Sequence, residues 1–245
     1  MRFEGRIALV TGGGRGIGRA TALALAAEGA HVAVLARTAA ECTDVAREAG
    51  ERSMAVACDV SNAEACRVAL GEIHRTLGRV DLLVHAAGIS PVRARAEKHE
   101  PDVFRQILDV NVAGAFNVAH ASAPQLLDGG GSVVLLASVL GTMASERLAA
   151  YGASKAALVQ LARTLGREWA SRAVRVNAVC AGYAPTAMTE QMFGVDRIRD
   201  EVIAAIPLGR LATIDEIVAA IIYLASDAAS YVTGTSLTVD GGMAA

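Results

Sequence analysis

The chain has 245 residues, of which 53% are hydrophobic and 20% are charged, and its formal net charge is −2. These values fit one large globular α/β domain and exclude a disordered chain. The small net charge argues against a general affinity for nucleic acid or for an anionic membrane.

Short apolar runs alternate with longer amphipathic segments along the whole chain. In chain order, we expect a strand at 7–10, a helix at 18–28, a strand at 32–35, a helix at 39–49, a strand at 54–58, a helix at 63–77, a strand at 82–85, a helix at 103–127, a strand at 133–137, a helix at 150–171, a strand at 174–180, a helix at 215–226 and a strand at 237–239. Nearly continuous runs of Val, Ile, Leu and Ala are typical of strands covered on both faces. The alternation therefore predicts a doubly wound parallel sheet, the Rossmann fold, in a single domain over residues 1–245 with about seven strands and helices on both faces. Its ligand crevice would lie at the carboxyl ends of the strands.

The stretch 187–207 interrupts this alternation. It is long, partly helical in pattern, and carries apolar side chains that include Met192, Phe193 and Ile198. Long connections of this kind often close over binding sites, so we expect a mobile lid over the crevice. The alternative is an ordinary surface helix that packs by its apolar side.

The N-terminal segment and the cysteines indicate the cellular environment. Residues 1–6 contain no apolar signal core, and the apolar run after them is too short to span a bilayer. Cys42, Cys58, Cys66 and Cys180 form no C-x-x-C pair and no ligand-like cluster with histidine. We therefore expect a cytoplasmic protein with reduced thiols and no metal site.

A glycine-rich turn follows the first expected strand and opens the first expected helix. Glycines permit a tight turn with positive φ and let the backbone approach a diphosphate, while the start of the helix offers free N–H groups and a positive dipole end. The sequence therefore predicts a dinucleotide site. The residues expected to form this part of it are Gly12, Gly14, Arg15, Gly16, Ile17 and Gly18.

The end of the second expected strand indicates which dinucleotide binds. An NAD-specific site usually has an acidic residue there, and its carboxylate would repel a 2′-phosphate. In this chain Ala36 takes that position and is followed by Arg37 and Thr38, while Arg15 can approach the same phosphate from the glycine turn. Two guanidinium groups make strong charge-assisted contacts with a phosphate, so we expect NADP(H). The alternative is that both arginines are simply solvated.

Tyr151 and Lys155, near the start of the expected helix 150–171, are candidates for proton transfer. They are four residues apart and share one helical face. An isolated tyrosine has a pKa near ~10 and is a poor base at neutral pH, whereas a nearby ammonium and an oxidised nicotinamide favour the phenolate. We expect a lowered pKa at Tyr151, although such pairs also occur by chance on many helices.

Glycines at 12, 16 and 18 have the spacing G-x-x-x-G-x-G, and residues 138–143 and 230–234 read SVLGTM and SYVTG. Together these segments resemble the short-chain dehydrogenase/reductase family, most strongly its 3-oxoacyl-[acyl-carrier-protein] reductase group, over nearly the whole chain. The resemblance implies a Rossmann fold and an NAD(P)-dependent oxidoreductase that moves a hydride to or from a carbonyl carbon.

By this resemblance the catalytic side chains are Asn111, Ser138, Tyr151 and Lys155. Tyr151 would protonate the carbonyl oxygen as general acid, and Ser138 would orient and polarise that oxygen. Lys155 would lower the tyrosine pKa and bind the nicotinamide ribose, and Asn111 would support proton resupply through water. On its own, Asn111 would more often be a helix-bending polar residue.

The resemblance also implies cofactor contacts at the ends of later strands. These contacts are Asp59, Val60, Ala87, Gly88, Ala184 and Thr186, together with Tyr151 and Lys155. Asp59 could equally cap the helix that follows it, and the two roles are compatible. Relatives carry Asn-Asn-Ala-Gly where this chain has residues 85–88, and we favour a strand-bracing His85 over a catalytic one. An alanine replaces the usual proline at 181, which loosens that turn slightly.

The expected substrate pocket is apolar or mixed. Its residues are Ser138, Leu140, Met143, Tyr151, Tyr183, Met188, Met192 and Phe193. The leading substrate is a 3-oxoacyl thioester, free or carrier-bound, while a hydroxysteroid, a polyol or a xenobiotic ketone stays open. Arg93, Arg95 and Lys98 can attract a carrier protein or another anionic group, or they can simply form a solvated loop.

Three classes of function remain, and we favour the NADPH-linked carbonyl reductase. The second is an NAD-dependent alcohol, polyol or hydroxysteroid dehydrogenase, and the third is a nucleotide-sensing module without turnover. A complete set of four catalytic side chains argues against the third. Small residues along 150–171 permit close helix packing, and with family precedent they lead us to expect a homotetramer without nucleic-acid or membrane partners.

Overall fold

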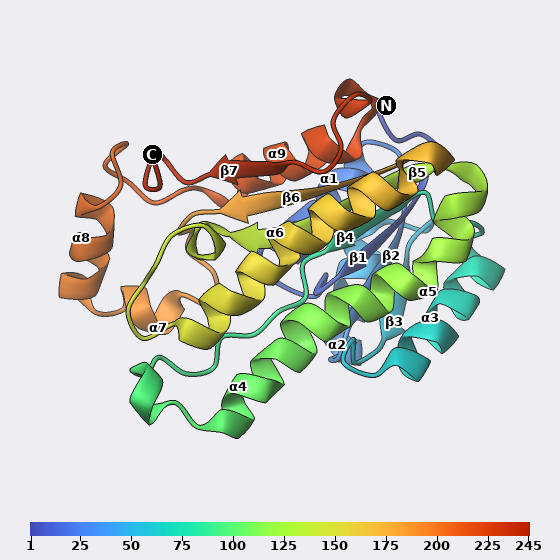
Figure 1. Cartoon of the computed structure of the whole chain (residues 1–245). Coiled ribbons are helices and arrows are strands. Elements are labelled where there is room, and N and C mark those ends of the chain that lie inside the picture. The colour runs from blue at the N-terminus through green and yellow to red at the C-terminus, as the bar shows by residue number, and fades with distance from the viewer.

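The computed structural model describes residues 1–245, except for the side chain of Gln191. Seven strands form one parallel sheet in the order β3-β2-β1-β4-β5-β6-β7 (Figure 1). The strands are β1 (Ile7–Thr11), β2 (His31–Ala36), β3 (Met54–Ala57), β4 (Leu82–His85), β5 (Gly131–Ser138), β6 (Val174–Ala181) and β7 (Ser236–Val239). The predicted doubly wound α/β fold is therefore confirmed.

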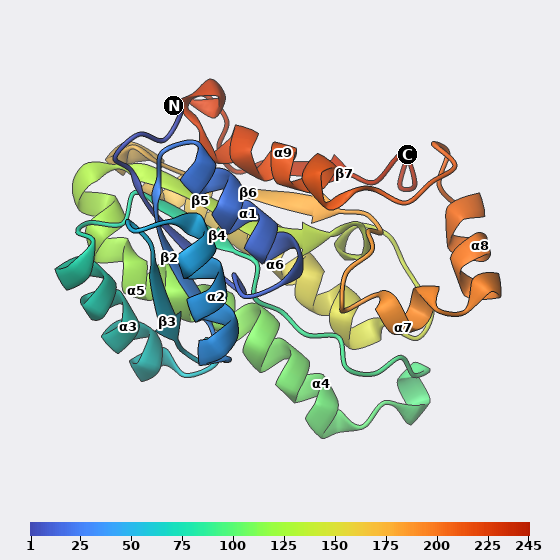
Figure 2. The ribbon, with the colours of Figure 1, turned by 180° about the vertical axis from the view of Figure 1, so that it is seen from behind.

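Helices pack on both faces of this sheet, as the opposite views of Figures 1 and 2 show. One face carries α1 (Gly16–Ala27), α2 (Ala39–Ala49) and α9 (Ile214–Ala225), and the other carries α3 (Ala63–Thr76), α5 (Gly114–Gly129) and α6 (Ala149–Trp169). Successive strand residues point to opposite faces. Leu9 accordingly packs on the side of α3, α5 and α6, while Ala8 and Val10 pack on the side of α1, α2 and α9. Burial on both faces explains why the strands read as continuous apolar runs.

The order of the strands reverses between β1 and β4. The chain first builds outward from β1 to β3 and then returns to place β4 on the other side of β1. In the sheet, Thr11 at the end of β1 pairs with Leu35 of β2 on one side and with His85 of β4 on the other. A ligand crevice is expected beyond the carboxyl ends of the strands at such a reversal.

The prediction of one continuous α-helix at 103–127 is wrong for the middle of this segment. The structure has α4 (Pro101–Leu108), a π-helical turn (Asp109–Ala113) and then α5 in unbroken succession. The π turn surrounds Asn111, which is fully buried and binds the backbone of Ile89. The apolar periodicity of the segment did not reveal this turn, because its partner lies in a distant part of the chain.

The stretch 187–207 contains two short helices, α7 (Glu190–Phe193) and α8 (Asp196–Ala204). They lie beyond the carboxyl ends of the strands and apart from the two main helical layers (Figure 1). Met188 and Val195 expose about half of their surfaces, at 49% and 47%. The role of the stretch 187–207 as a mobile lid stays a prediction.

Short 3₁₀ turns complete the fold at Ala96–Lys98, Val139–Gly141, Ala170–Arg172 and Asp227–Ala229. Among the helices that the structure describes, none has both the length and the apolar character that crossing a membrane requires.

Candidate active site

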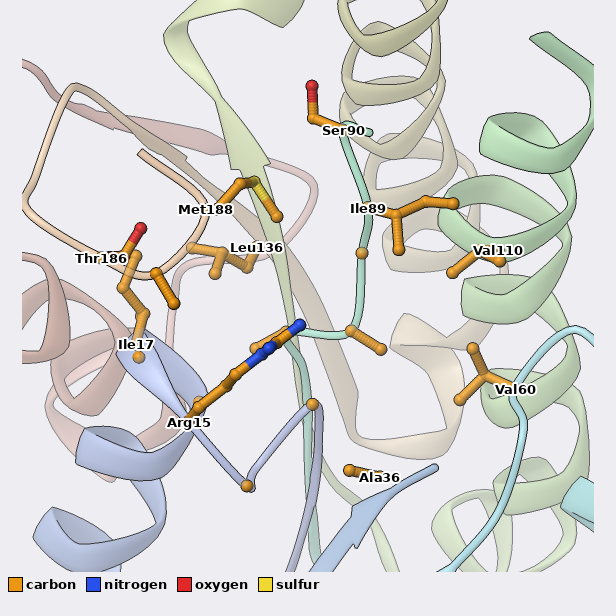
Figure 3. A pocket seen from close by; sticks show the side chains of 18 of the residues that line it. Arg15, Ile17, Ala36, Val60, Ile89, Ser90, Val110, Leu136, Thr186 and Met188 are labelled. Carbon is orange, nitrogen blue, oxygen red and sulfur yellow. The ribbon is translucent and has the colours of Figure 1, made fainter. Parts of the chain in front are cut away.

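A pocket of about 530 Å³ opens at the carboxyl ends of the strands. Every residue that the sequence predicts to bind the cofactor lines it, from the glycine turn to Thr186. Figure 3 shows Ile17, Leu136, Thr186 and Met188 on one side of this pocket and Val60 and Val110 on the other, with Arg15 extending between them. The crevice is therefore bounded by segments from both halves of the sheet.

The glycine turn packs so tightly against the surrounding backbone that two of its positions admit no side chain. A Cβ placed on Gly18 would lie 2.2 Å from the carbonyl oxygen of Gly12. One placed on Gly12 would lie 2.7 Å from the backbone nitrogen of Ala87, and Gly12 also has a φ of 64°. The turn can thus pack against both the start of α1 and the segment after β4 only with glycine at these positions. It directs the N-terminus of α1 into the pocket, where free N–H groups favour an anion.

Both predicted arginines lie in the same pocket beside Ala36 and Thr38. In the described part of the chain, neither Arg15 nor Arg37 forms an ion pair with a carboxylate within 4.0 Å. The Arg15 side chain reaches into the open pocket (Figure 3). The pocket is thus lined by one guanidinium group from the turn after β1 and by another from the segment after β2.

Two carboxylates also line this end of the pocket, Glu41 and Asp59. Asp59 does not cap α3; Asn62 does, by accepting a hydrogen bond from the nitrogen of Ala65 at 2.9 Å. The Asp59 carboxylate instead accepts hydrogen bonds from the side chain and backbone of Ser61, which lower its pKa, with the charge of Arg37 as a smaller cause. Sequence reasoning missed Glu41, because its place in the pocket depends on how α2 packs against the glycine turn.

Ser138, Tyr151 and Lys155 line the opposite part of the same pocket. Ser138 is the last residue of β5, and the other two lie on the first turns of α6. The Nζ atom of Lys155 donates a hydrogen bond of 2.7 Å to the carbonyl oxygen of Leu136 and lies 5.6 Å from the centroid of the Tyr151 ring. The structure therefore brings together the three side chains that the sequence predicts for proton transfer.

The expected lowering of the Tyr151 pKa is wrong for the side chains of this chain by themselves. Burial raises the pKa of Tyr151 to about 12, although a hydrogen bond with Ser138 acts in the opposite direction. Burial also lowers the pKa of Lys155 to about 8. Removing a group from water disfavours its ionised form, which raises the pKa of the phenol and lowers that of the amine. Tyr151 is therefore a neutral phenol at physiological pH.

Asn111 lies beneath the pocket rather than in its wall. Its side chain accepts a hydrogen bond from the Ile89 nitrogen at 2.8 Å, and it donates to the Ile89 carbonyl oxygen and to Oγ of Ser154, both at 3.0 Å. A Cβ on Gly88 would lie 3.3 Å from Oδ1 of Asn111 and 3.5 Å from Nζ of Lys155. Asn111 thus fixes the segment after β4 next to Lys155. Its predicted part in a water relay stays a proposal.

His85 is fully buried at the end of β4. Its Nδ1 atom lies 2.9 Å from Oγ1 of Thr11, and the same hydroxyl oxygen accepts a hydrogen bond from the nitrogen of Ala87 at 3.3 Å. Burial, followed by the charge of Lys155, lowers the pKa of His85 to about 3, so the ring is neutral. This network connects β1, β4 and the segment after β4, which fits the bracing role expected for His85.

The expected substrate residues fall into three groups. Ser138, Tyr151 and Met188 line the pocket itself. Leu140, Met143 and Tyr183 pack around Tyr151 in a small apolar cluster, and Leu140 is only 6% exposed, so it supports the wall rather than forming it.

The two remaining residues, Met192 and Phe193, lie farther out. Phe193 packs edge-on against Tyr183, and Met192 contacts the guanidinium group of Arg93. Sequence reasoning also missed Ile89, Ser90 and Pro91, which line the pocket after β4. No sequence motif indicated these three residues.

Within the described part of the chain, no group of three or more His, Cys, Asp and Glu side chains could hold a metal ion.

Known proteins share this arrangement over nearly the whole chain. A family model described as enoyl-(acyl carrier protein) reductase matches residues 12–244. The 3-oxoacyl-[acyl-carrier-protein] reductase of Salmonella typhimurium is 36% identical over 244 residues, which cover 99% of each chain. Galactitol 2-dehydrogenase (L-tagatose-forming) of Cereibacter sphaeroides is 40% identical over 246 residues, which cover 99% of this chain and 96% of that protein.

A solved structure agrees with these relatives. The crystal structure of a gluconate 5-dehydrogenase from Burkholderia cenocepacia in complex with NADP and tartrate superposes with a TM-score of 0.95, at 34% identity, and covers 99% of this chain and 96% of that one. The chain therefore belongs to the short-chain dehydrogenase/reductase family, whose members are oxidoreductases acting on carbonyl and alcohol groups.

Proposed function

We propose that the protein is an NADPH-dependent carbonyl reductase, which converts a ketone to a secondary alcohol or catalyses the reverse. The observation that carries this proposal is that one pocket contains both the glycine turn with its two arginines and the side chains Ser138, Tyr151 and Lys155. The pocket suits a nicotinamide dinucleotide, since four glycines of the turn line it and leave the backbone open to a diphosphate. When bound, the nicotinamide supplies or accepts the hydride.

The roles of the protein side chains follow from their protonation. Tyr151 keeps its proton at neutral pH, so it suits the general acid that protonates the carbonyl oxygen during reduction. Ser138, whose hydrogen bond with Tyr151 favours the phenolate, can hold the same oxygen beside the phenol. Lys155 has a pKa of about 8 and is mostly charged at neutral pH, so it can donate hydrogen bonds to a ribose hydroxyl.

The preference for NADPH rests on the 2′-phosphate end of the pocket. Ala36 leaves no carboxylate at the end of β2, and Arg15 and Arg37 both line the pocket there. The gluconate 5-dehydrogenase neighbour, solved with NADP, supports this choice. Fluorescence titration with NADPH and NADH tests it, and equal affinity for the two cofactors would contradict it.

The leading substrate is a 3-oxoacyl thioester, free or carrier-bound. The 36% identity to a 3-oxoacyl-[acyl-carrier-protein] reductase supports it, as do the apolar lining residues Leu136 and Met188. The loop after β4 adds exposed Arg93, Arg95 and Lys98, which suit an acidic carrier. The second candidate is a polyol or its ketose, because galactitol 2-dehydrogenase is 40% identical.

A screen of carbonyl compounds, followed by NADPH absorbance, distinguishes the two candidates. The set should contain a 3-oxoacyl-CoA or N-acetylcysteamine thioester, a ketose such as tagatose and a simple cyclic ketone. The thioester should give the highest kcat/KM. A higher value with the ketose would favour the polyol candidate, and no turnover with any ketone in the presence of NADPH or NADH would contradict the proposed function.

Three further properties belong to the proposal. Residues 187–207 act as a lid over the pocket, supported by the place of Met188 in its wall and by the contact between Met192 and Arg93. Four copies of the chain associate, and the protein works in the cytoplasm.

A further inference from the structure

Glu41 lies on the glycine turn at the mouth of the pocket. It belongs to the first turn of α2, and its side chain packs on Gly14 so closely that a Cβ placed there would lie 2.8 Å from Cβ of Glu41 and 3.0 Å from its Oε2. The residue lines the same pocket as Arg15 and Arg37. Its carboxylate therefore lies against the residue before Arg15, in the pocket that also contains both arginines proposed to bind the 2′-phosphate.

The charge of Glu41 is not neutralised by an ion pair. Two other acidic residues of α2 are paired: Asp44 with Arg47 at 3.1 Å and Glu48 with Arg19. Across the residues that the structure describes, no Lys, Arg or His lies within 4.0 Å of the Glu41 carboxylate oxygens. The pocket that contains Arg15 and Arg37 is thus also lined by a carboxylate without an ion-pair partner among the described residues.

We propose that Glu41 is a specificity-determining residue that weakens the binding of NADPH relative to NADH. This inference deepens the proposed function and rests on its assignment of the 2′-phosphate to Arg15 and Arg37. A carboxylate in the same pocket repels a phosphate ester with up to two negative charges, whereas it does not repel the neutral 2′-hydroxyl of NADH. Glu41 therefore opposes the arginines and moves the protein toward use of both cofactors.

Glu41→Gln tests this role because it removes the charge and keeps nearly the same shape. We expect the Kd of NADPH, measured by fluorescence or calorimetric titration, to fall by about three- to tenfold. The Kd of NADH should change by less than about twofold, since its ribose carries no phosphate. The gain for NADPH should shrink as salt is raised from about 0.05 M to about 0.5 M, because exposed charges are screened.

Asp44→Asn is the matched control. It removes the same charge from the same helix, but Asp44 lies on the exposed side of α2 in its pair with Arg47. Its ratio of NADPH to NADH affinity should equal that of the unmodified protein. Thermal unfolding of both variants identifies any general loss of structure, which would weaken the binding of NADPH and NADH equally.

Two results would overturn the inference. One is an unchanged ratio of NADPH to NADH affinity in Glu41→Gln. The other is weaker NADPH binding in that variant, which would mean that Glu41 orients an arginine toward the phosphate. The failure of the cofactor proposal is seen separately, as tighter binding of NADH than of NADPH by the unmodified chain. Even then, the ratio between Glu41→Gln and the unmodified chain still decides the role of Glu41.

Discussion

Burial decides the protonation of the two residues on the first turns of α6. Lys155 is 4% exposed, and its pKa falls to about 8, while the pKa of Tyr151 rises to about 12. From the sequence we predicted that the ammonium would lower the tyrosine pKa, because the spacing of the pair is visible and its desolvation is not. At the residue scale, sequence identifies which groups meet, but only packing determines their charge.

Tyr151→Phe should abolish turnover while cofactor binding persists. The substitution removes the only atom of the ring that can donate a proton, and loss of a positioned general acid typically costs about 10²- to 10⁴-fold in rate. The measurements are kcat with the best ketone and the Kd of NADPH. Tyr223→Phe, at a 41% exposed position on α9, is the control and should keep full activity. Retained turnover in Tyr151→Phe would contradict the proposed mechanism.

The free energy of unfolding should rise with pH because of Lys155. The unfolded chain has an ordinary lysine pKa of 10.5 and the folded chain one of about 8, so between these values the unfolded state binds more protons. Folding therefore gains about 2 kcal/mol between about pH 7 and about pH 10 from this group. Above about pH 10 the raised Tyr151 pKa acts in the opposite direction.

Urea unfolding at several pH values, without added cofactor, measures this effect. Burial raises the pKa values of the Cys42 and Cys180 thiols, and raised thiol pKa values lower the stability of the folded chain as the pH rises through the same range. Measurements on the unmodified chain alone therefore cannot isolate the contribution of Lys155. Lys155→Met keeps the thiols and removes the amine. As the pH rises, the unfolding free energy of the unmodified chain should increase relative to that of Lys155→Met. A difference that stays constant with pH would contradict the lowered pKa of Lys155.

At the scale of elements, the glycine turn was predicted in full and the π turn was not. Glycine spacing after an apolar strand has a local cause, since the turn is built by neighbouring residues. The π turn at Asp109–Ala113 depends on Asn111 binding Ile89, 22 residues earlier in the chain. Glu41 was missed for a similar reason, since its contact with Gly14 exists only after α2 has packed.

Gly18→Ala should lower the stability of the folded chain as well as its affinity for the cofactor. The new Cβ would lie 2.2 Å from the carbonyl oxygen of Gly12, which is backbone and cannot rotate away. We expect a loss of about 1–3 kcal/mol in the free energy of unfolding and a loss of NADPH binding of at least about tenfold.

Denaturant unfolding and cofactor titration measure both effects. Gly71→Ala, on the exposed side of α3 with nothing within 4 Å of the new Cβ, is the matched control and should be neutral or stabilising. If Gly18→Ala behaved like this control, the close packing of the turn would be refuted.

At the scale of the whole molecule, the sequence predicted the sheet, its parallel strands and both helical layers. This success has a physical basis, since strands buried on both faces must be apolar throughout and the helices between them must be amphipathic. Side-chain placement around the pocket was predicted where residues lie at strand ends. Leu140, which was expected to contact substrate, is 6% exposed and packs in the apolar cluster with Tyr151, so its contact with substrate stays a prediction.

The proposed homotetramer is tested by sedimentation equilibrium. The small side chains of α6 permit close approach of another helix, and closed symmetry is the norm for soluble assemblies. We expect a mass close to four times the 25.2 kDa of one chain at micromolar concentration. A single species of one chain mass at the highest concentration would exclude the tetramer.

The contact between Gly12 and Ala87 has a consequence for the order of assembly. The turn after β1 is local, but the surface beneath it comes from the segment after β4, about 75 residues later in the sequence. A growing chain that ends before β4 would already contain all the glycines of the turn. It would still lack the segment after β4 against which Gly12 packs. A fragment that ends before β4 should therefore bind the nucleotide more weakly than the whole chain, and the ligand should stabilise the complete sheet more than that fragment.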